Sequence, residues 1–197
     1  MHASRPRRFV FIANPKTGTS AFAKALNPYC NVKSASIKGM GDHWPASMVK
    51  TWFQEERGWD WADFYSFMAI RDPWRRAVST YLYGRRREQS IWHKPAMAAE
   101  TLLDFLQSDI VTAPQRVRTL DYMARDEDGA MLIDHIFRIE DVEDEAPRLS
   151  ERIGAPLALE RVNVTPSYEY REFFCEAAVE LVRERYRSDI EFGGYEY

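Results

Sequence analysis

The sequence predicts an α/β fold in which a mostly parallel sheet is covered by helices on both faces, giving three layers. Apolar runs at residues 9–13, 64–70 and 133–139 are short and have the composition of buried strands. Each run is followed by a segment with apolar residues at helical spacing. Strands that alternate with helices are typical of a parallel sheet with helices on both faces, and ligands bind such sheets beyond the carboxyl ends of the strands.

Local patterns predict the remaining elements. Asp72 before Pro73 marks a helix start, because aspartate caps a helix and proline suits its first position. The helix that follows residues 9–13 has Phe22, Ala25 and Leu26 on one face. The other expected elements are a possible strand at 32–37 and helices around 102–106, 142–153 (ended by Gly154) and 173–182.

Length and composition predict one folded domain, 1–197, with residues 1–8 as a basic, flexible tail. The chain has 197 residues, of which 45% are hydrophobic and 14% aromatic. The net charge of −3 gives no global basic field for nucleic acid. No long apolar segment follows the basic start, so we expect neither a secretory signal nor a membrane span, and a cytoplasmic protein. Cys30 and Cys175 fit neither a disulfide framework nor a metal site.

The segment FIANPKTGTSAFAKAL, residues 11–26, reads as half of a phosphate-binding loop. Lys16 precedes Gly18, and the first glycine of the usual nucleoside-triphosphate loop is missing. Gly18 lets the backbone approach an anion, Thr19 and Ser20 add hydroxyl donors, and Lys16 supplies a full charge near a helix N-terminus. The predicted sheet is therefore P-loop-like. The alternative is a simple turn with Thr19 as helix cap and Lys16 in solvent.

A second segment, AIRDPWRRAVSTY at residues 69–81, offers another anion site. Arg71 ends a predicted strand, and Ser79 lies one helical turn after Arg75, off the predicted apolar stripe. A guanidinium beside a helical hydroxyl can bind a second phosphate. The alternative is a surface arginine–aspartate pair and a solvated serine. One loop and one arginine–serine pair predict a nucleotide with phosphates at two separate positions.

Together the two segments resemble the cofactor motifs of the sulfotransferases, especially the glycan-directed branch. The similarity spans roughly residues 9–197, although Val142 replaces the family's usual leucine. Asn163 and Tyr170 match family positions near the cofactor. The further matching segments are HWPASMVKTWF (43–53), FRIEDVEDEAPRLSERIG (137–154), RVNVTPSYEYREFF (161–174) and YRSDIEFGGYEY (186–197).

The resemblance implies a metal-independent O-sulfotransferase that uses 3′-phosphoadenosine 5′-phosphosulfate as co-substrate. Lys16 would contact the sulfuryl group and the bridging oxygen, and the site would hold no metal. The acceptor would be a glycan, an oligosaccharide lipid or a small-molecule alcohol. The residues that would bind the donor's 5′ end are Lys16, Thr17, Gly18, Thr19 and Ser20, and those that would bind its 3′-phosphate are Arg71 and Ser79.

The reaction needs a base for the acceptor hydroxyl, and His43 is the preferred residue. It lies in the turn GMGDHWPAS, at the position of the family's histidine segment, and an imidazole titrates near neutrality. Asp42 stays an alternative, because some family members use a carboxylate. His2 falls in the expected tail, His93 in an uncertain loop, and His135 inside an apolar strand where a structural role is expected.

Two other functions remain open from the sequence. A non-catalytic nucleotide-binding protein could keep this fold without the chemistry, and a P-loop-type phosphotransferase could use the same loop. The phosphotransferase would need an acidic strand end that holds a metal, and no convincing one is seen. Lys16 together with an available base favours the sulfotransferase.

Overall fold

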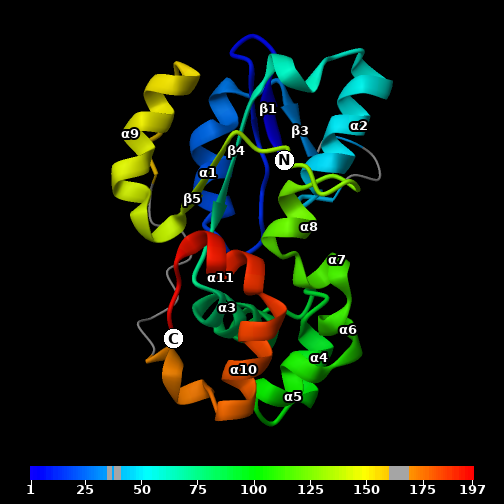
Figure 1. The fold of residues 1–197 in the computed structure, drawn as a ribbon, viewed down its shortest axis with the longest axis vertical. Coiled ribbons are helices and arrows are strands. Elements are labelled where there is room, and N and C mark those ends of the chain that lie inside the picture. Colours follow the sequence, from blue (N-terminus) through cyan, green and yellow to red (C-terminus); the bar gives the residue numbers. More distant parts are fainter. Residues whose placement is uncertain (35–36, 38–40, 160–168) are drawn as a thin grey trace. The chain divides into compact units, whose positions relative to one another are not determined.

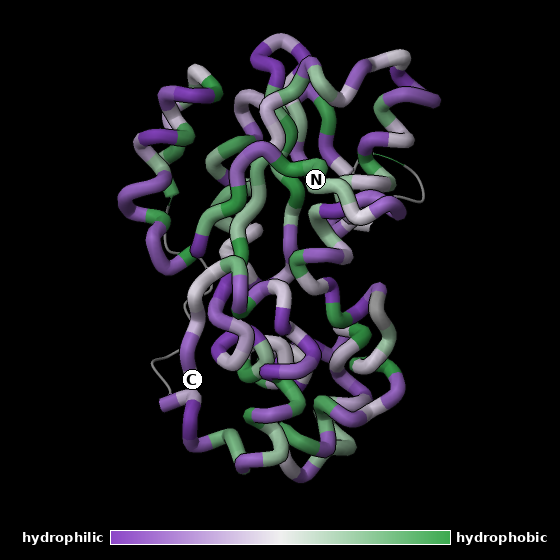
Figure 2. The backbone as a smooth tube through the Cα atoms, in the orientation of Figure 1, coloured by the Kyte–Doolittle hydropathy of each residue, from purple (hydrophilic) through white to green (hydrophobic). Residues whose placement is uncertain are grey.

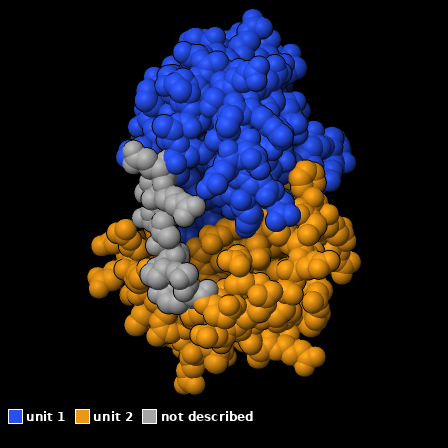
Figure 3. Space-filling view, turned by 90° about the vertical axis from the view of Figure 1, so that its left-hand side faces the viewer, with its two compact units in different colours: residues 1–70, 121–163 blue, residues 71–120, 164–197 orange. Residues whose placement is uncertain are grey.

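The structure is a computed structural model that describes residues 1–34, 37, 41–159 and 169–197. The chain groups into two compact units, shown in Figure 3. Unit 1 comprises Met1–Ile70 and Asp121–Asn163, and unit 2 comprises Arg71–Leu120 and Val164–Tyr197. Each unit is described by itself. The prediction of one domain rests on chain length and stays a prediction.

Unit 1 holds a five-stranded mixed sheet with the strand order β3-β1-β2-β4-β5 (Figure 1). The neighbours β2, β4 and β5 are parallel, which confirms the predicted α/β class. Strand β1 runs antiparallel to both β2 and β3 and was not predicted. The strands are β1 (His2–Ser4), β2 (Phe9–Phe11), β3 (Val32–Lys33), β4 (Tyr65–Ile70) and β5 (His135–Arg138).

The prediction of a flexible tail at residues 1–8 is wrong, because β1 lies inside the sheet. Ala3 is fully buried and pairs with Val10 on one side and Val32 on the other. Three residues are too few to show the alternation that marks a strand, and the arginines that follow suggest exposure. The possible strand at 32–37 is shorter than expected in the described part of the chain, and residues 35–36 lie outside it.

Helices cover both sides of the sheet of unit 1. Figure 1 shows α1 and α9 on one side and α2 on the other. The helical segments are α1 (Thr19–Leu26), η1 (Asn27–Tyr29), α2 (Ala46–Arg57), η3 (Trp61–Asp63), α8 (Leu120–Ala124, in unit 1 from Asp121 onward), η4 (Ile139–Asp141) and α9 (Val142–Ile153).

An aromatic core joins the sheet to α1 and α9. The Phe11 and Phe22 rings stack at a centroid distance of 4.9 Å, and Phe22 also contacts Phe137 on β5. Figure 2 shows apolar positions along the strands of unit 1, whereas α9 is mostly hydrophilic. The buried residues of α9 are Leu149 and Ile153, one helical turn apart, so this helix binds the sheet through a narrow stripe.

Unit 2 is helical. Asp72 caps α3 as predicted, because its carboxylate accepts hydrogen bonds from the amides of Trp74 (2.9 Å) and Arg75 (3.1 Å). The predicted helix at 173–182 begins later than expected, with Phe173 in the preceding turn. The helical segments are α3 (Pro73–Arg86), α4 (His93–Ala98), α5 (Leu102–Gln107), α6 (Asp109–Thr112), α7 (Pro114–Val117), η5 (Tyr170–Phe173), α10 (Glu176–Arg185) and α11 (Arg187–Gly193).

A buried ion pair ties α3 to α11 inside unit 2. Arg76 donates to the Asp189 carboxylate at 3.3 Å, and the two side chains are 3% and 0% exposed. Arg76 also donates to the carbonyl of Arg118, while Asp189 accepts from the amide of Leu120. A buried charge is tolerated when it is paired and hydrogen-bonded in this way. The pair therefore anchors residues 118–120 to both helices.

Candidate anion-binding loop and candidate base

The predicted phosphate-binding loop joins β2 to α1 in unit 1. The chain leaves the sheet after Ile12, whose amide donates to the carbonyl of Phe67 at 2.9 Å. The loop is held from inside by Thr17, which is fully buried and whose hydroxyl donates to the carbonyl of Asn14 at 2.8 Å. The turn is therefore braced by the side chain of Thr17.

Two residues of this loop have left-handed backbone conformations. Lys16 has φ 66° and Gly18 has φ 75°. A lysine rarely adopts this conformation, and such strain gathers at functional sites. Turns of this kind point successive backbone amides toward one side and form anion-binding concavities.

Gly18 is also confined by its surroundings. A Cβ atom added there would lie 2.9 Å from Cδ1 and 3.3 Å from Cγ1 of Ile139, the residue that follows β5. Both the positive φ and this close approach require glycine. The loop is therefore packed against the carboxyl end of β5.

The start of α1 has the properties of an anion site. Gly18 is the N-cap residue, and no side chain caps the helix. The first-turn amides of a helix lack intrahelical partners and carry partial positive charge. The alternative in which Thr19 caps the helix is wrong, because Thr19 is its first helical residue. Thr19 is half-buried and Ser20 exposed, and Lys16 adds a half-buried ammonium group three residues ahead of the helix.

The structure brings His43 to this loop. Its Nδ1 atom lies 2.7 Å from the carbonyl oxygen of Ala13, three residues before Lys16. A carbonyl oxygen only accepts hydrogen bonds, so Nδ1 carries a proton, and in the neutral imidazole the lone pair is then on Nε2. In that tautomer, Nε2 is the nitrogen that can take a proton from an acceptor. The neighbouring Asp42 is exposed, and its backbone carbonyl accepts from the Met1 amino group.

Arg71 and Ser79 belong to unit 2 and are described within it. Arg71 directly follows β4 and is half-buried. Ser79 lies on α3 and is 5% exposed, so the reading as a solvated serine is wrong. One ion pair of this segment joins the exposed Arg75 to the buried Asp72 at 3.4 Å. Asn163 lies outside the described residues.

The other three histidines differ in their hydrogen-bond partners. His135 bonds through Nε2 to the Glu145 carboxylate at 2.8 Å, in agreement with its expected structural role. The Nδ1 atom of His93 bonds to the carbonyl of Gly84. His2 lies in β1, and its Nδ1 is buried without a hydrogen-bond partner in the described part of the structure. Burial lowers the pKa of His2 to about 4.

Sequence reasoning missed two contributors to the site, the carbonyl of Ala13 and the side chain of Ile139. A backbone acceptor leaves no signal in the residue type. Ile139 was detectable in principle, because the carboxyl ends of parallel strands meet at one edge of a sheet. Cys30 and Cys175 are both free thiols.

Two further properties of the described residues concern metal binding and membrane insertion. Within the ranges given above, no three histidine, cysteine, aspartate or glutamate residues gather to hold a metal ion. In the same ranges, no helix has both the length and the apolar character needed to cross a membrane.

Comparison with known proteins adds no assignment to this geometry. The sequence matches no model of a protein family, and no curated protein matches it.

Proposed function

We propose that the protein is an O-sulfotransferase that moves a sulfuryl group from 3′-phosphoadenosine 5′-phosphosulfate to an acceptor hydroxyl. The observation that carries the proposal is the hydrogen bond between His43 Nδ1 and the carbonyl of Ala13. It joins a candidate base to the backbone of a candidate anion loop. An anion site alone fits many nucleotide-binding proteins, whereas a base beside it fits group transfer to a hydroxyl.

The loop suits the 5′ end of this donor. The uncapped start of α1 and the left-handed turn at Lys16 and Gly18 favour a phosphate, with Thr17 bracing the turn. Ile139 fills the space behind Gly18, so an anion has to approach from the other side of the turn. Arg71 and Ser79 would bind the 3′-phosphate.

In the proposed reaction the acceptor oxygen forms a bond to sulfur while the bond from sulfur to the bridging oxygen breaks. The hydroxyl proton passes to Nε2 of His43, and adenosine 3′,5′-bisphosphate leaves. The Lys16 ammonium group would stabilise the charge that grows on the bridging oxygen, and this stabilisation is largest in the transition state. No step in this scheme requires a metal, and metal independence stays part of the proposal.

The acceptor is proposed to be a carbohydrate or a small alcohol. Trp44 follows His43 directly and is half-buried. An indole ring has a flat apolar face and a polar edge, which suits a sugar ring beside the base. The predictions of a cytoplasmic location and of no nucleic-acid partner rest on the sequence alone.

The test is the transfer of labelled sulfate from the donor to a panel of polysaccharides, oligosaccharides and alcohols. We expect label in at least one acceptor. Lys16→Ala should lose most of this transfer, whereas Lys24→Ala, which changes an exposed residue in the last turn of α1, should keep it. Bisphosphate binding without any transfer would favour a non-catalytic nucleotide-binding protein. Transfer of phosphate from ATP would favour a phosphotransferase.

A further inference from the structure

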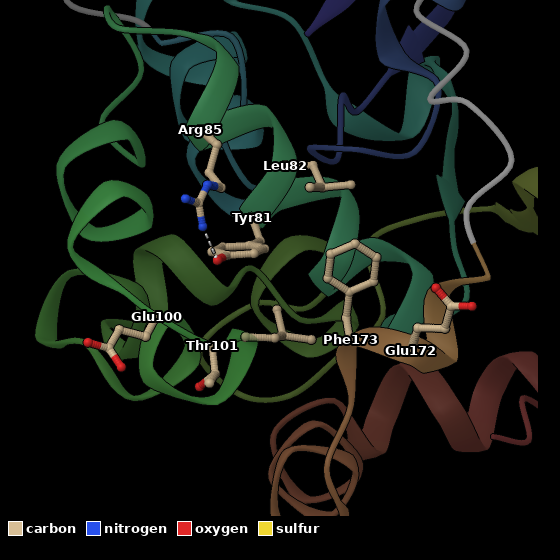
Figure 4. Close-up of a pocket in the computed structure, with 8 residues that line it drawn as sticks. Tyr81, Leu82, Arg85, Glu100, Thr101, Glu172 and Phe173 are labelled. Carbon is tan, nitrogen blue, oxygen red and sulfur yellow. Dashed lines mark hydrogen bonds between the residues drawn. The ribbon is translucent and has the colours of Figure 1, made fainter.

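Unit 2 contains a pocket that plays no part in the proposed reaction. It has a volume of about 460 Å³ and lies between α3, the start of α5 and η5. This volume is in the range of small-molecule sites. Figure 4 shows Tyr81 and Leu82 from α3 and Phe173 from η5 around the same space.

Half of the residues that line the pocket are apolar or aromatic, namely Tyr81, Leu82, Leu102 and Phe173. Tyr81 and Leu102 are 4% and 2% exposed. The Tyr81 ring lies 5.3 Å from the Phe105 ring behind it and meets the Phe173 ring edge-on at 6.5 Å. Aromatic faces attract cations as well as apolar groups. The pocket therefore offers a preformed surface for a ligand with an apolar body.

The positive charge at the pocket is already engaged by the protein. Arg85 donates to the hydroxyl of Tyr81 at 2.5 Å, and its guanidinium lies 5.4 Å from the centre of the same ring (Figure 4). One of the five N–H donors of the guanidinium is used in this hydrogen bond, and part of its positive charge faces the Tyr81 ring.

The negative charges at the pocket are not engaged in this way. Glu100 and Glu172 line it on opposite sides in the view of Figure 4. Both residues are exposed, and among the described residues neither carboxylate has an ion-pair partner. Two carboxylates and one engaged guanidinium leave the pocket with a net negative character.

The start of α5 does not offset this charge. The Thr101 hydroxyl and amide both donate to the carboxylate of Asp104, and the Asp104 amide donates back to Thr101. This reciprocal capping box uses the amide and hydroxyl of Thr101 and the amide of Asp104. Asp104 therefore adds a further carboxylate near the pocket, and the Thr101 donors are bonded to it.

We infer that this pocket binds a small organic cation with an apolar body, such as an aryl- or alkylammonium ion. The apolar part would lie against Tyr81, Leu102 and Phe173, and the ammonium group would face Glu100 or Glu172. This assignment does not depend on sulfuryl transfer, because it uses residues outside the loop and the base.

The test compares three probes of one size by ligand-observed NMR titration: 2-phenylethylammonium, 2-phenylethanol and phenylacetate. The ammonium ion should bind most tightly and phenylacetate least. Glu172→Gln or Glu100→Gln should weaken ammonium binding about three- to fivefold, as expected for a partly exposed ion pair. Glu176→Gln, an exposed carboxylate of α10 that does not line the pocket, is the matched control and should bind like the wild type.

Three results would overturn the inference. Phenylacetate that binds as tightly as the ammonium ion would make Arg85 the recognising charge. Equal binding of the ammonium ion to the wild type and to both pocket variants would place it elsewhere, and no binding of any probe would leave the pocket without a ligand of this class. Circular dichroism of each variant ensures that a lost signal does not reflect unfolding.

Discussion

His43 and Ala13 are thirty residues apart in the chain, and the imidazole Nδ1 of one lies 2.7 Å from the carbonyl oxygen of the other. Because a carbonyl oxygen only accepts, the contact favours the neutral tautomer with its proton on Nδ1. It also ties the turn before α2 to the backbone that leads into the anion loop. The candidate base and the candidate anion site are thus parts of one arrangement inside unit 1.

Gly18→Ala should disrupt the loop in two ways, by steric crowding and by backbone strain. The change places a methyl group 2.9 Å from Ile139 Cδ1 and imposes a φ of 75° on a residue with a Cβ. We expect a loss of about 1–3 kcal/mol in the free energy of unfolding and at least tenfold weaker bisphosphate binding. Chemical denaturation and calorimetric titration measure the two effects.

Two further variants separate crowding from backbone strain at this site. Gly129→Ala meets no neighbouring atom at a similar φ of 80° and should lose only the backbone part. Adding Ile139→Val to Gly18→Ala removes the crowding methyl group and should restore part of the binding. If the double variant binds bisphosphate no better than Gly18→Ala, crowding by Ile139 does not shape the loop.

Much of the local structure was predictable from the sequence, because short-range chemistry determines it. The start of α3 follows from Asp72 and Pro73, and the end of α9 follows from Gly154 in a left-handed conformation. Strand β1 was not predictable in this way. Ala3 and Ser4 are buried and His2 is half-buried because β1 pairs with β2 and β3, and such pairing depends on partners elsewhere in the chain.

The candidate site was predictable in its residue types and less so in its contacts. Lys16 and Gly18 lie two residues apart in one short segment, so the sequence alone shows that they can act together in a loop. The contact of His43 with Ala13 and that of Gly18 with Ile139 join separate segments, and no local pattern encodes them. Ser79 was expected off the apolar face of α3 and is buried, because α3 is enclosed on more sides than one stripe.

Adenosine 3′,5′-bisphosphate should raise the thermal midpoint of unfolding, and ATP should do so far less. A ligand that binds only the folded state stabilises it by about 2.7 kcal/mol at a hundredfold excess over its dissociation constant. Arg71→Ala should abolish most of the difference between the two nucleotides, while Arg87→Ala at the exposed end of α3 should not. Equal shifts by both nucleotides in the wild type would remove Arg71 and Ser79 from the proposed 3′-phosphate site.

Arg76→Ala should strongly destabilise the protein, because it leaves the Asp189 carboxylate buried without its cation. Loss of one partner of a buried pair costs about 3–5 kcal/mol. The adjacent Arg75 is the control: its side chain is 53% exposed, and Arg75→Ala should change the free energy of unfolding by at most about 1 kcal/mol. Urea denaturation distinguishes the two, and similar losses in both variants would contradict a special role for the buried pair.

Stability should fall as the pH drops from 7 to 5, partly because of His2. Burial, the nearby Met1 amino group and Lys33 lower its pKa to about 4, and Asp42 opposes them. The unfolded chain takes up this proton near pH 6.5, so the unfolded state gains protons first and the folded state loses stability as the pH falls. The expected contribution is about 2 kcal/mol between pH 7 and pH 5.

His2→Phe keeps a flat ring of similar size in β1 and removes this titration. Its free energy of unfolding should depend less on pH than that of the wild type over the same range. The Met1 amino group, whose pKa burial lowers to about 6, titrates in both proteins and largely cancels in the comparison. Parallel pH profiles for the two proteins would show that His2 is not the group responsible.

The most direct test of the account is the initial rate of labelled-sulfate transfer at saturating donor, measured for the wild type, His43→Asn and Asp42→Asn. We predict that the wild type transfers sulfate to a hydroxyl acceptor and that His43→Asn is slower by about 10²–10⁴-fold, the range for loss of a general base. Its bisphosphate affinity should be unchanged, and Asp42→Asn should stay close to the wild type. Absence of transfer by the wild type, or a normal rate in His43→Asn, would contradict the central claim.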